Sequence, residues 1–343
     1  MEPAVRPTHR RGTLALLLAA SIGTAFGPAS TGLRSTPEPV DRPPAGSAGP
    51  SLSRWEHRYR VSGRVWVVFW ISRENVGSAR MTRRREGGAD SISFLGGSDP
   101  RRAPNNLNQW GYAVEDASGR DVLVFVIRSI APTDANVPEA GLADGAEPGL
   151  FGASCTAVGG ERSRASITGI RVPPSVTFRS FPQLVEALSG ASRWETSEKP
   201  RPSGAFPGFF SAVMDSIDDS VARASAGVPQ PRVTLRRYIF RGTLFDLTTR
   251  NVERAGPDLL RGKYTYRNRT TGDDADFSIT FGTRGDLAGV PVEMVFQPSW
   301  WARVQLRLDD SVDVPEDPVN DRGVYDDISR ICGRVLGFSS PIP

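Results

Sequence analysis

Few side chains in this sequence could act as a nucleophile, a proton carrier or a metal ligand. The chain has two histidines and two cysteines, and one of the histidines, His9, falls in an N-terminal export signal. A Ser-His-Asp or Cys-His unit would therefore have to use His57, and no Gly-x-Ser-x-Gly motif supplies a nucleophile. Histidine-based metal clusters are excluded, and two cysteines cannot build a zinc or iron–sulfur site alone. We interpret His57 as a surface or packing histidine and predict no metal site.

Carboxylates are the remaining catalytic option. A glycoside hydrolase needs only two carboxylates, held about 5 to 10 Å apart. The groups that could supply them are Asp273, Asp274 and Asp276, or Asp309, Asp310 and Asp313. Each group is equally typical of a solvated turn, so the pattern favours a protein without catalytic residues and leaves an envelope glycan hydrolase open. The acidic stretch 313–327 lacks calcium-loop spacing and is interpreted as a connector.

Nucleotide and nucleic-acid chemistry have no support in the sequence. There is no Gly-x-Gly-x-x-Gly, and Gly262-Lys263 is followed by Tyr264 where a P-loop requires Ser or Thr. The formal net charge is +4, and it falls to +2 once the N-terminal signal is removed with three arginines and one glutamate. A near-neutral exported protein is not a nucleic-acid binder by charge. We predict no cofactor and no nucleic-acid partner.

Aromatic residues are the best candidates for holding a ligand. Trp300 and Trp301 are adjacent in an expected strand, so one must enter the apolar layer while the other could stack on a sugar or plug a cavity; cross-strand packing is the alternative. Trp110 closes the loop from residue 96, whose turn residues and amides could bind a ligand or simply form a rigid turn. Phe209 and Phe210 belong to an amphipathic segment and would face the concavity of a curved sheet.

The N-terminal region predicts export. Residues 1–25 contain a basic segment, an apolar run of about 14 residues and small residues before a cleavage point after Ala25, which is the pattern of a secretory signal. That run is shorter than the roughly 20 residues a spanning helix needs, so we expect no membrane span after its removal. Residues 26–53 form a flexible leader. We therefore expect the protein to be periplasmic or secreted. In such an oxidising compartment Cys155 and Cys332 would form a disulfide, and two buried free thiols are the alternative.

The remaining chain, residues 54–338, predicts one β-rich domain with a possible internal junction at 131–152. Alternating apolar residues favour a long strand from Tyr59 to Ile71, followed by a turn at residues 72–75. An amphipathic helix is expected over residues 206–221 and a short one over 324–335. The other expected strands lie at residues 76–84, 90–95, 109–115, 121–130, 154–158, 163–172, 233–241, 244–252, 263–269, 277–282, 291–296 and 302–309. No βαβ rhythm is present, so the fold class is mainly β (β-rich α+β), with antiparallel strands throughout.

A sheet this wide must curl or split, so we expect a large curved antiparallel sheet or half-barrel around the long helix. The pattern of Gly63 to Arg84, and that of Tyr264 to Leu308 with its Ser299-Trp-Trp, resembles exported bacterial β-rich proteins of uncharacterised function. The order of strands and helix is similar to the half-barrel of periplasmic lipoprotein carriers. From the curved sheet and the helix we expect an exported, non-catalytic protein that holds an apolar or amphipathic ligand, such as an acyl chain or a lipoprotein tail; a structural component of an envelope assembly is an alternative. The resemblance itself is architectural. It transfers no functional residues.

Overall fold

The computed structural model describes most of the chain from Ser53 onward. The described residues are 53–66, 70–86, 89–99, 101–103, 110–116, 121–129, 149–159, 161–172, 185, 188–190, 194–231, 233–299, 302–314 and 322–336. The elements are β1 (Ser53–Trp66), β2 (Trp70–Glu86), β3 (Ala89–Ser98), β4 (Trp110–Asp116), β5 (Asp121–Ser129), β6 (Gly149–Gly159), β7 (Arg162–Val172), β8 (Glu195–Pro200), α2 (Phe209–Ser225), β9 (Thr234–Phe240), β10 (Thr243–Gly256), β11 (Leu259–Asn268), β12 (Asp274–Gly282), η3 (Gly285–Leu287), β13 (Pro291–Ser299), β14 (Ala302–Leu308) and α3 (Arg322–Leu336).

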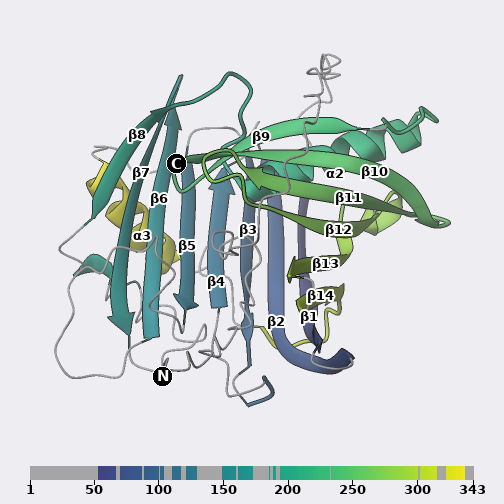
Figure 1. Cartoon of the computed structure of the whole chain (residues 1–343), viewed down its shortest axis with the longest axis horizontal. Helices are drawn as coiled ribbons and strands as arrows, with labels where there is room; N and C mark the ends of the chain where they lie inside the picture. The colour runs from purple at the N-terminus through teal and green to yellow at the C-terminus, as the bar shows by residue number, and fades with distance from the viewer. Residues whose placement is uncertain are drawn as a thin grey trace, which may run out of the picture.

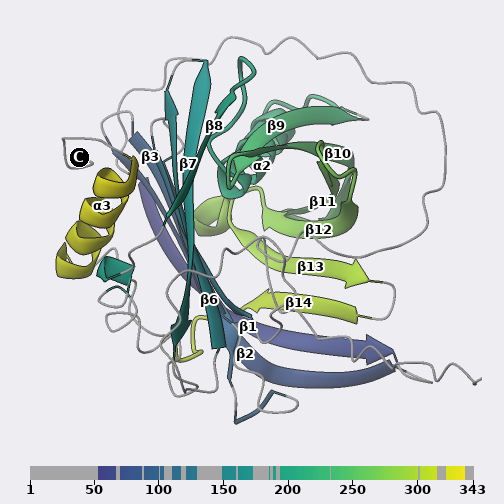
Figure 2. The same cartoon turned by 60° about the vertical axis from the view of Figure 1, so that its left-hand side comes forward.

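The strands form one antiparallel sheet of 14 strands, in the order β8-β7-β6-β5-β4-β3-β2-β1-β14-β13-β12-β11-β10-β9. The sheet is open and strongly curved: strands β9 to β13 bend round α2, while β3 to β7 stay flatter (Figure 2). The curl brings the β9–β10 turn against β7 and β8. A Cβ at Gly242 would lie 2.9 Å from the Cβ of Ala165 and 3.2 Å from Oγ of Ser197. The predicted fold class is confirmed.

The expected long strand from Tyr59 to Ile71 is wrong. The chain reverses inside it, because β1 ends at Trp66 and β2 begins at Trp70, and these two residues pair. Consecutive apolar residues from Trp66 onward do not alternate with polar ones, so they carried no information about strand direction. The expected turn at residues 72–75 is instead an irregular part of β2. There the pairing of β1 with β2 shifts in register between Val61 and Gly63, and Asn75 has a φ of 56°. Turn-forming residues suit such bulges for the same conformational reason that they suit turns.

The two long helices lie on opposite faces of the sheet (Figures 1 and 2). Around α2 gathers the larger core, which contains Phe94 of β3, Tyr238 of β9 and Phe281 of β12. Under α3 a smaller core contains Trp110 and Tyr112 of β4 with Cys155 of β6. Successive residues of β4 thus serve different cores: Tyr112 and Val114 face α3, while Ala113 belongs to the core around α2.

Other expectations can be compared with the described residues. The hairpin of β6 and β7, the antiparallel order of β9 to β14 and the helix that carries Cys332 are confirmed. Strand β8, whose side chains are all exposed, has no apolar pattern and was not expected. The export signal, the leader and nearly all of the expected junction at 131–152 fall outside the described part of the chain. Within the described part, no helix has the length and apolar character to cross a membrane.

Candidate functional site

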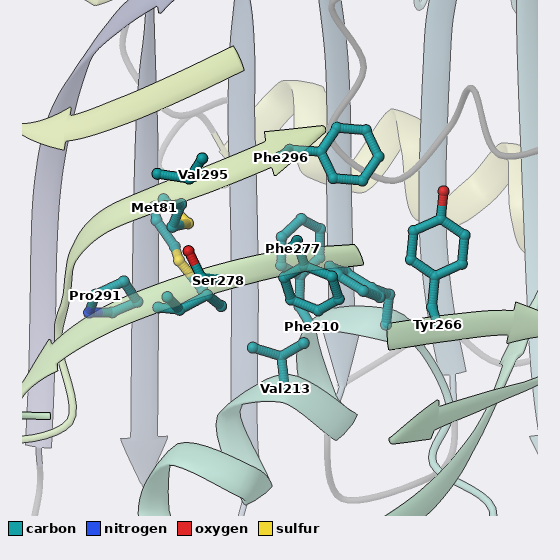
Figure 3. Close-up of a pocket in the computed structure, with 12 residues that line it drawn as sticks. Met81, Phe210, Val213, Tyr266, Phe277, Ser278, Pro291, Val295 and Phe296 are labelled. Atoms are coloured by element: carbon teal, nitrogen blue, oxygen red, sulfur yellow. The ribbon is translucent and has the colours of Figure 1, made fainter. Parts of the chain in front are cut away.

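The site best supported by the described residues is a narrow apolar slot between α2 and the inner face of the curved sheet (Figure 3). We call it the apolar slot. Its walls include Phe210 and Val213 of α2, Phe277 and Ile279 of β12, and Met294 and Phe296 of β13. Alternation places these strand residues inside, since Phe277 pairs with Phe296 and Ile279 with Met294 across the β12–β13 ladder. The cavity measures about 30 Å³, which is the room that one water molecule takes.

The surface of the slot is almost entirely apolar, and Tyr266 is the titratable residue among those that line it. Burial raises the pKa of Tyr266, and the nearby Asp274, Asp273 and Asp276 raise it further. The phenol therefore stays neutral at physiological pH and can act as a hydrogen-bond donor. The slot can receive the apolar part of a ligand among its aromatic rings.

Helix α2 forms one wall of the slot and is fixed at its N-terminus by a buried carboxylate. Glu115 of β4 is 1% exposed and accepts hydrogen bonds from the backbone N–H of Phe210 at 3.1 Å and of Ser211 at 2.7 Å. The Ser211 hydroxyl donates to the same carboxylate at 2.8 Å. A Cβ at Gly208 would lie 2.2 Å from the Glu115 carboxyl carbon, so only glycine leaves room there. The carboxylate thus satisfies N–H groups that have no partner within the helix.

Burial raises the pKa of Glu115, and the hydrogen bonds from Ser211 and Phe210 oppose that rise. Desolvation is the larger of the two effects because the group lies in the interior of the sheet–helix interface. The buried carboxylate therefore acts as an anchor of the helix.

Two ion-pair groups fix the rest of α2. Arg83 of β2, 5% exposed, donates to Asp218 of α2 at 3.0 and 2.8 Å and to Asp90 of β3 at 2.9 and 2.5 Å. On the opposite side, Nε of Arg236 in β9 donates to Asp215 of α2 at 2.7 Å. Hydrogen bonds to both carboxylates raise the pKa of Arg83 and outweigh the effect of its burial. Helix α2 is thereby attached to strands from both halves of the sheet.

Aromatic contacts follow the same arrangement. The ring of Phe210 stacks on Phe94 of β3 with centroids 5.2 Å apart. The ring of Phe209 lies 5.6 Å from both Tyr238 of β9 and Phe277 of β12. Phe209 and Phe210, predicted from sequence to hold a ligand, both line the apolar slot.

The other predicted site residues are not brought to the slot. Trp110 is 1% exposed and lies in the core under α3, on the opposite face of the sheet. Trp300 and Trp301 are outside the described residues. The disulfide between Cys155 and Cys332 is confirmed, with Cα atoms 5.5 Å apart.

The residues considered for catalysis do not line the apolar slot. Asp273 and Asp276 accept hydrogen bonds from Thr271 and Thr265, both at 2.5 Å, and Asp274 is exposed. His57 pairs with Asp310, with Nδ1 3.1 Å from Oδ2. Among the described residues, no three His, Cys, Asp or Glu side chains group so that they could hold a metal ion.

Comparisons of the chain with family models, curated proteins and solved structures found no match. The resemblance to exported β-rich proteins and to lipoprotein carriers therefore stays a prediction. Sequence patterns alone missed Glu115, Gly208 and Arg83 as determinants of the site. The available signal in the sequence was a carboxylate, Glu115, at the end of a mostly apolar expected strand. The sequence did not show that it would bind the N-terminus of α2.

Proposed function

We propose that this protein is an exported, non-catalytic binding or carrier protein of the bacterial envelope, which holds an apolar or amphipathic ligand such as an acyl chain. The apolar slot is the observation that carries the proposal. Its walls are mostly rings and aliphatic side chains from α2, β12 and β13. Ligand sites of this class are mostly apolar. The single disulfide agrees with an oxidising compartment.

A chain of several methylene groups needs more room than the slot has when empty. We expect β13 to move, because its ladder is irregular on both sides. The register shifts between Thr280 and Phe281 on the β12 side and between Phe296 and Ser299 on the β14 side. Irregular ladders lose hydrogen bonds locally and open at lower free energy than continuous ones. Each methylene group buried would contribute about 0.8 kcal/mol toward that opening.

The test is a fatty-acid titration of the purified exported protein, combined with native mass spectrometry and lipid extraction. Val213 lines the slot, and Val213→Phe fills its space, so this variant should bind about tenfold more weakly, the cost of overpacking one ring. Val221 lies two turns further along α2, packs against the same core and does not line the slot. Val221→Phe is thus the matched control and should bind like the unmodified protein.

Two results would remove the proposal. One is a flat titration together with no lipid in the extract. The other is equal binding by Val213→Phe and the unmodified protein when circular dichroism shows both folded, because the ligand would then sit elsewhere.

A further inference from the structure

A second pocket lies on the outer face of the sheet, where β1, β2 and β14 run side by side. We call it the basic pocket. It has a volume of about 60 Å³ and is lined by four arginines, Arg64, Arg73, Arg303 and Arg307, with the hydroxyls of Ser62 and Ser72. Gln305 and Glu74 complete the polar wall. Its position is opposite to the apolar slot, because Val304 and Leu306 of β14 are buried on the inner face while Arg303 and Arg307 alternate with them.

Register places like charges directly opposite each other in this pocket. Arg64 of β1 pairs with Arg303 of β14, and Arg60 pairs with Arg307 four positions away along each strand. Like charges directly opposite in neighbouring strands are destabilising, so an arrangement of this kind needs a compensating anion. Arg60 has such a partner in Asp309, and Arg307 has one in Glu293, with Nε 3.1 Å from Oε1.

Arg64, Arg73 and Arg303 have no carboxylate partner within the described part of the chain. Glu74 is the single acidic residue among those that line the pocket, beside four arginines, and it is exposed. The pocket therefore keeps a local excess of positive charge. This contrasts with Arg83, whose guanidinium is saturated by two carboxylates.

Protection of a sheet edge does not account for Arg64 and Arg303. Charged residues on edge strands prevent sheets from pairing with one another. Strands β1, β2 and β14 are adjacent in the middle of the 14-stranded order, with six strands beyond them on the β8 side and five on the β9 side. At Arg64 and Arg303, β1 and β14 have paired strands on both sides, so these two charges have no edge to protect. Arg73 lies on the part of β2 before Gly77, where the pairing with β3 begins.

We propose that the basic pocket binds a phosphate-type oxyanion, either as a free ion or as the phosphate of a lipid headgroup. Guanidinium groups bind phosphate through two parallel N–H···O bonds, and serine hydroxyls add further donors. The guanidinium groups of Arg64 and Arg303, which are cross-strand neighbours, would each bind the anion. Arg73 would add a third positive charge, and hydroxyl donors would come from Ser62 and Ser72. The space, about that of two water molecules, suits a small anion and excludes an aromatic group. This site is independent of the apolar slot and of the function proposed for it.

The first experiment titrates inorganic phosphate into the purified protein by calorimetry at low ionic strength. The double variant Arg64→Gln/Arg303→Gln should bind about tenfold or more weakly, since it removes charge-assisted hydrogen bonds. The double variant Arg101→Gln/Arg284→Gln removes the same charge from exposed positions elsewhere and should bind normally. Glu74→Gln should bind several-fold more tightly, because it removes the only carboxylate in the lining.

A lysine variant tests whether phosphate binding depends on the shape of the guanidinium groups or only on their positive charge. Arg64→Lys/Arg303→Lys keeps the charge and loses the planar forks, so its phosphate affinity should fall below that of the unmodified protein. Phosphate binding that is absent in the unmodified protein overturns the proposal. So does equal loss in the Arg101/Arg284 control, because binding would then depend only on net charge. Circular dichroism spectra of the variants establish that they are folded.

Vesicles distinguish the two sources of the phosphate. Co-sedimentation with phosphatidylglycerol vesicles, compared with phosphatidylcholine vesicles, should depend on Arg64 and Arg303 if a lipid headgroup enters the pocket. Phosphate binding with no such vesicle dependence assigns the pocket to a free or soluble phosphate. Failure of both inorganic phosphate and phosphatidylglycerol to bind overturns the proposal and leaves the apolar slot unaffected.

Discussion

Helices α2 and α3 pack on opposite faces of the same sheet, and they are attached to it by different means. Helix α2 is held by charged groups from strands in both halves of the sheet: Glu115 at its N-terminus, Arg83 on one side and Arg236 on the other. Helix α3 is held by the Cys155–Cys332 disulfide and has most of its contacts with β5, β6 and β7. Helix α2 therefore connects the two halves of the sheet and holds their curvature, whereas α3 covers one region of the sheet.

Side chains from the strands cap α2 at its N-terminus and α3 at its C-terminus. The N-terminus of α2 receives the carboxylate of Glu115. The last carbonyls of α3 accept from β7 instead, because Arg164 donates to the carbonyl of Leu336 at 2.7 Å and Ser166 to that of Val335 at 3.2 Å. Each helix end thus meets charge of the favourable sign. In both cases a strand, and not the helix itself, provides the capping group.

The largest expected effect comes from breaking the covalent attachment of α3. The disulfide closes a loop with a sequence separation of 177 residues, so the chain-entropy model gives Cys155→Ser/Cys332→Ser a loss of about 5 kcal/mol in the free energy of unfolding. Denaturant unfolding measures it. Hydrogen exchange should show faster exchange in α3 with little change in α2. Equal loss of protection in both helices would contradict the independence of the two attachments.

A smaller loss is expected when one ion pair of α2 is removed. Asp218→Asn takes one of two carboxylates from the buried Arg83, which keeps Asp90. We expect a loss of about 2 kcal/mol in unfolding free energy, less than the 3 to 5 that follow complete isolation of a buried charge. Asp258→Asn, which affects an exposed ion pair with Arg284, is the control and should cost under about 0.5 kcal/mol. Equal effects of the two variants would mean that burial of Arg83 has no energetic consequence.

The smallest effect concerns pH. Because the pKa of Glu115 is raised in the folded protein, its favourable contribution is fully present below the ordinary pKa of a glutamate and is lost as pH rises through the higher folded value. Glu115→Gln lacks this titration. Its stability deficit of about 1 kcal/mol, from an imperfectly matched hydrogen bond, should therefore shrink as pH rises from 4 to 8. Chemical unfolding at each pH measures this, and a deficit that grows with pH would show that the helix donors lower the pKa.

Much of the fold was predictable because one face of the second half of the sheet is buried. Phe277, Ile279 and Phe281 alternate with polar residues, and period two leaves little choice of face or register. The prediction was wrong where alternation stops, at Trp66, and it had no signal for β8, whose residues are all exposed. Helical periodicity predicted the aromatic part of the candidate site, Phe209 and Phe210. It could not place Trp110, which lies in the core under α3, because alternation along a strand does not say which helix covers which face.

The amino-acid sequence by itself determined the antiparallel β-rich class and the amphipathic helix over Phe209, and it left two alternatives for the only two cysteines, a disulfide or a pair of free thiols. Periodicity and composition act locally or allow few alternatives. The tertiary structure alone decided that Glu115 lies under the α2 N-terminus, that Arg83 lies between two carboxylates, and that Arg64 lies opposite Arg303. These pairings depend on which strands become neighbours and on how far the sheet curls. Both properties arise from contacts between residues far apart in the chain, which no local pattern encodes.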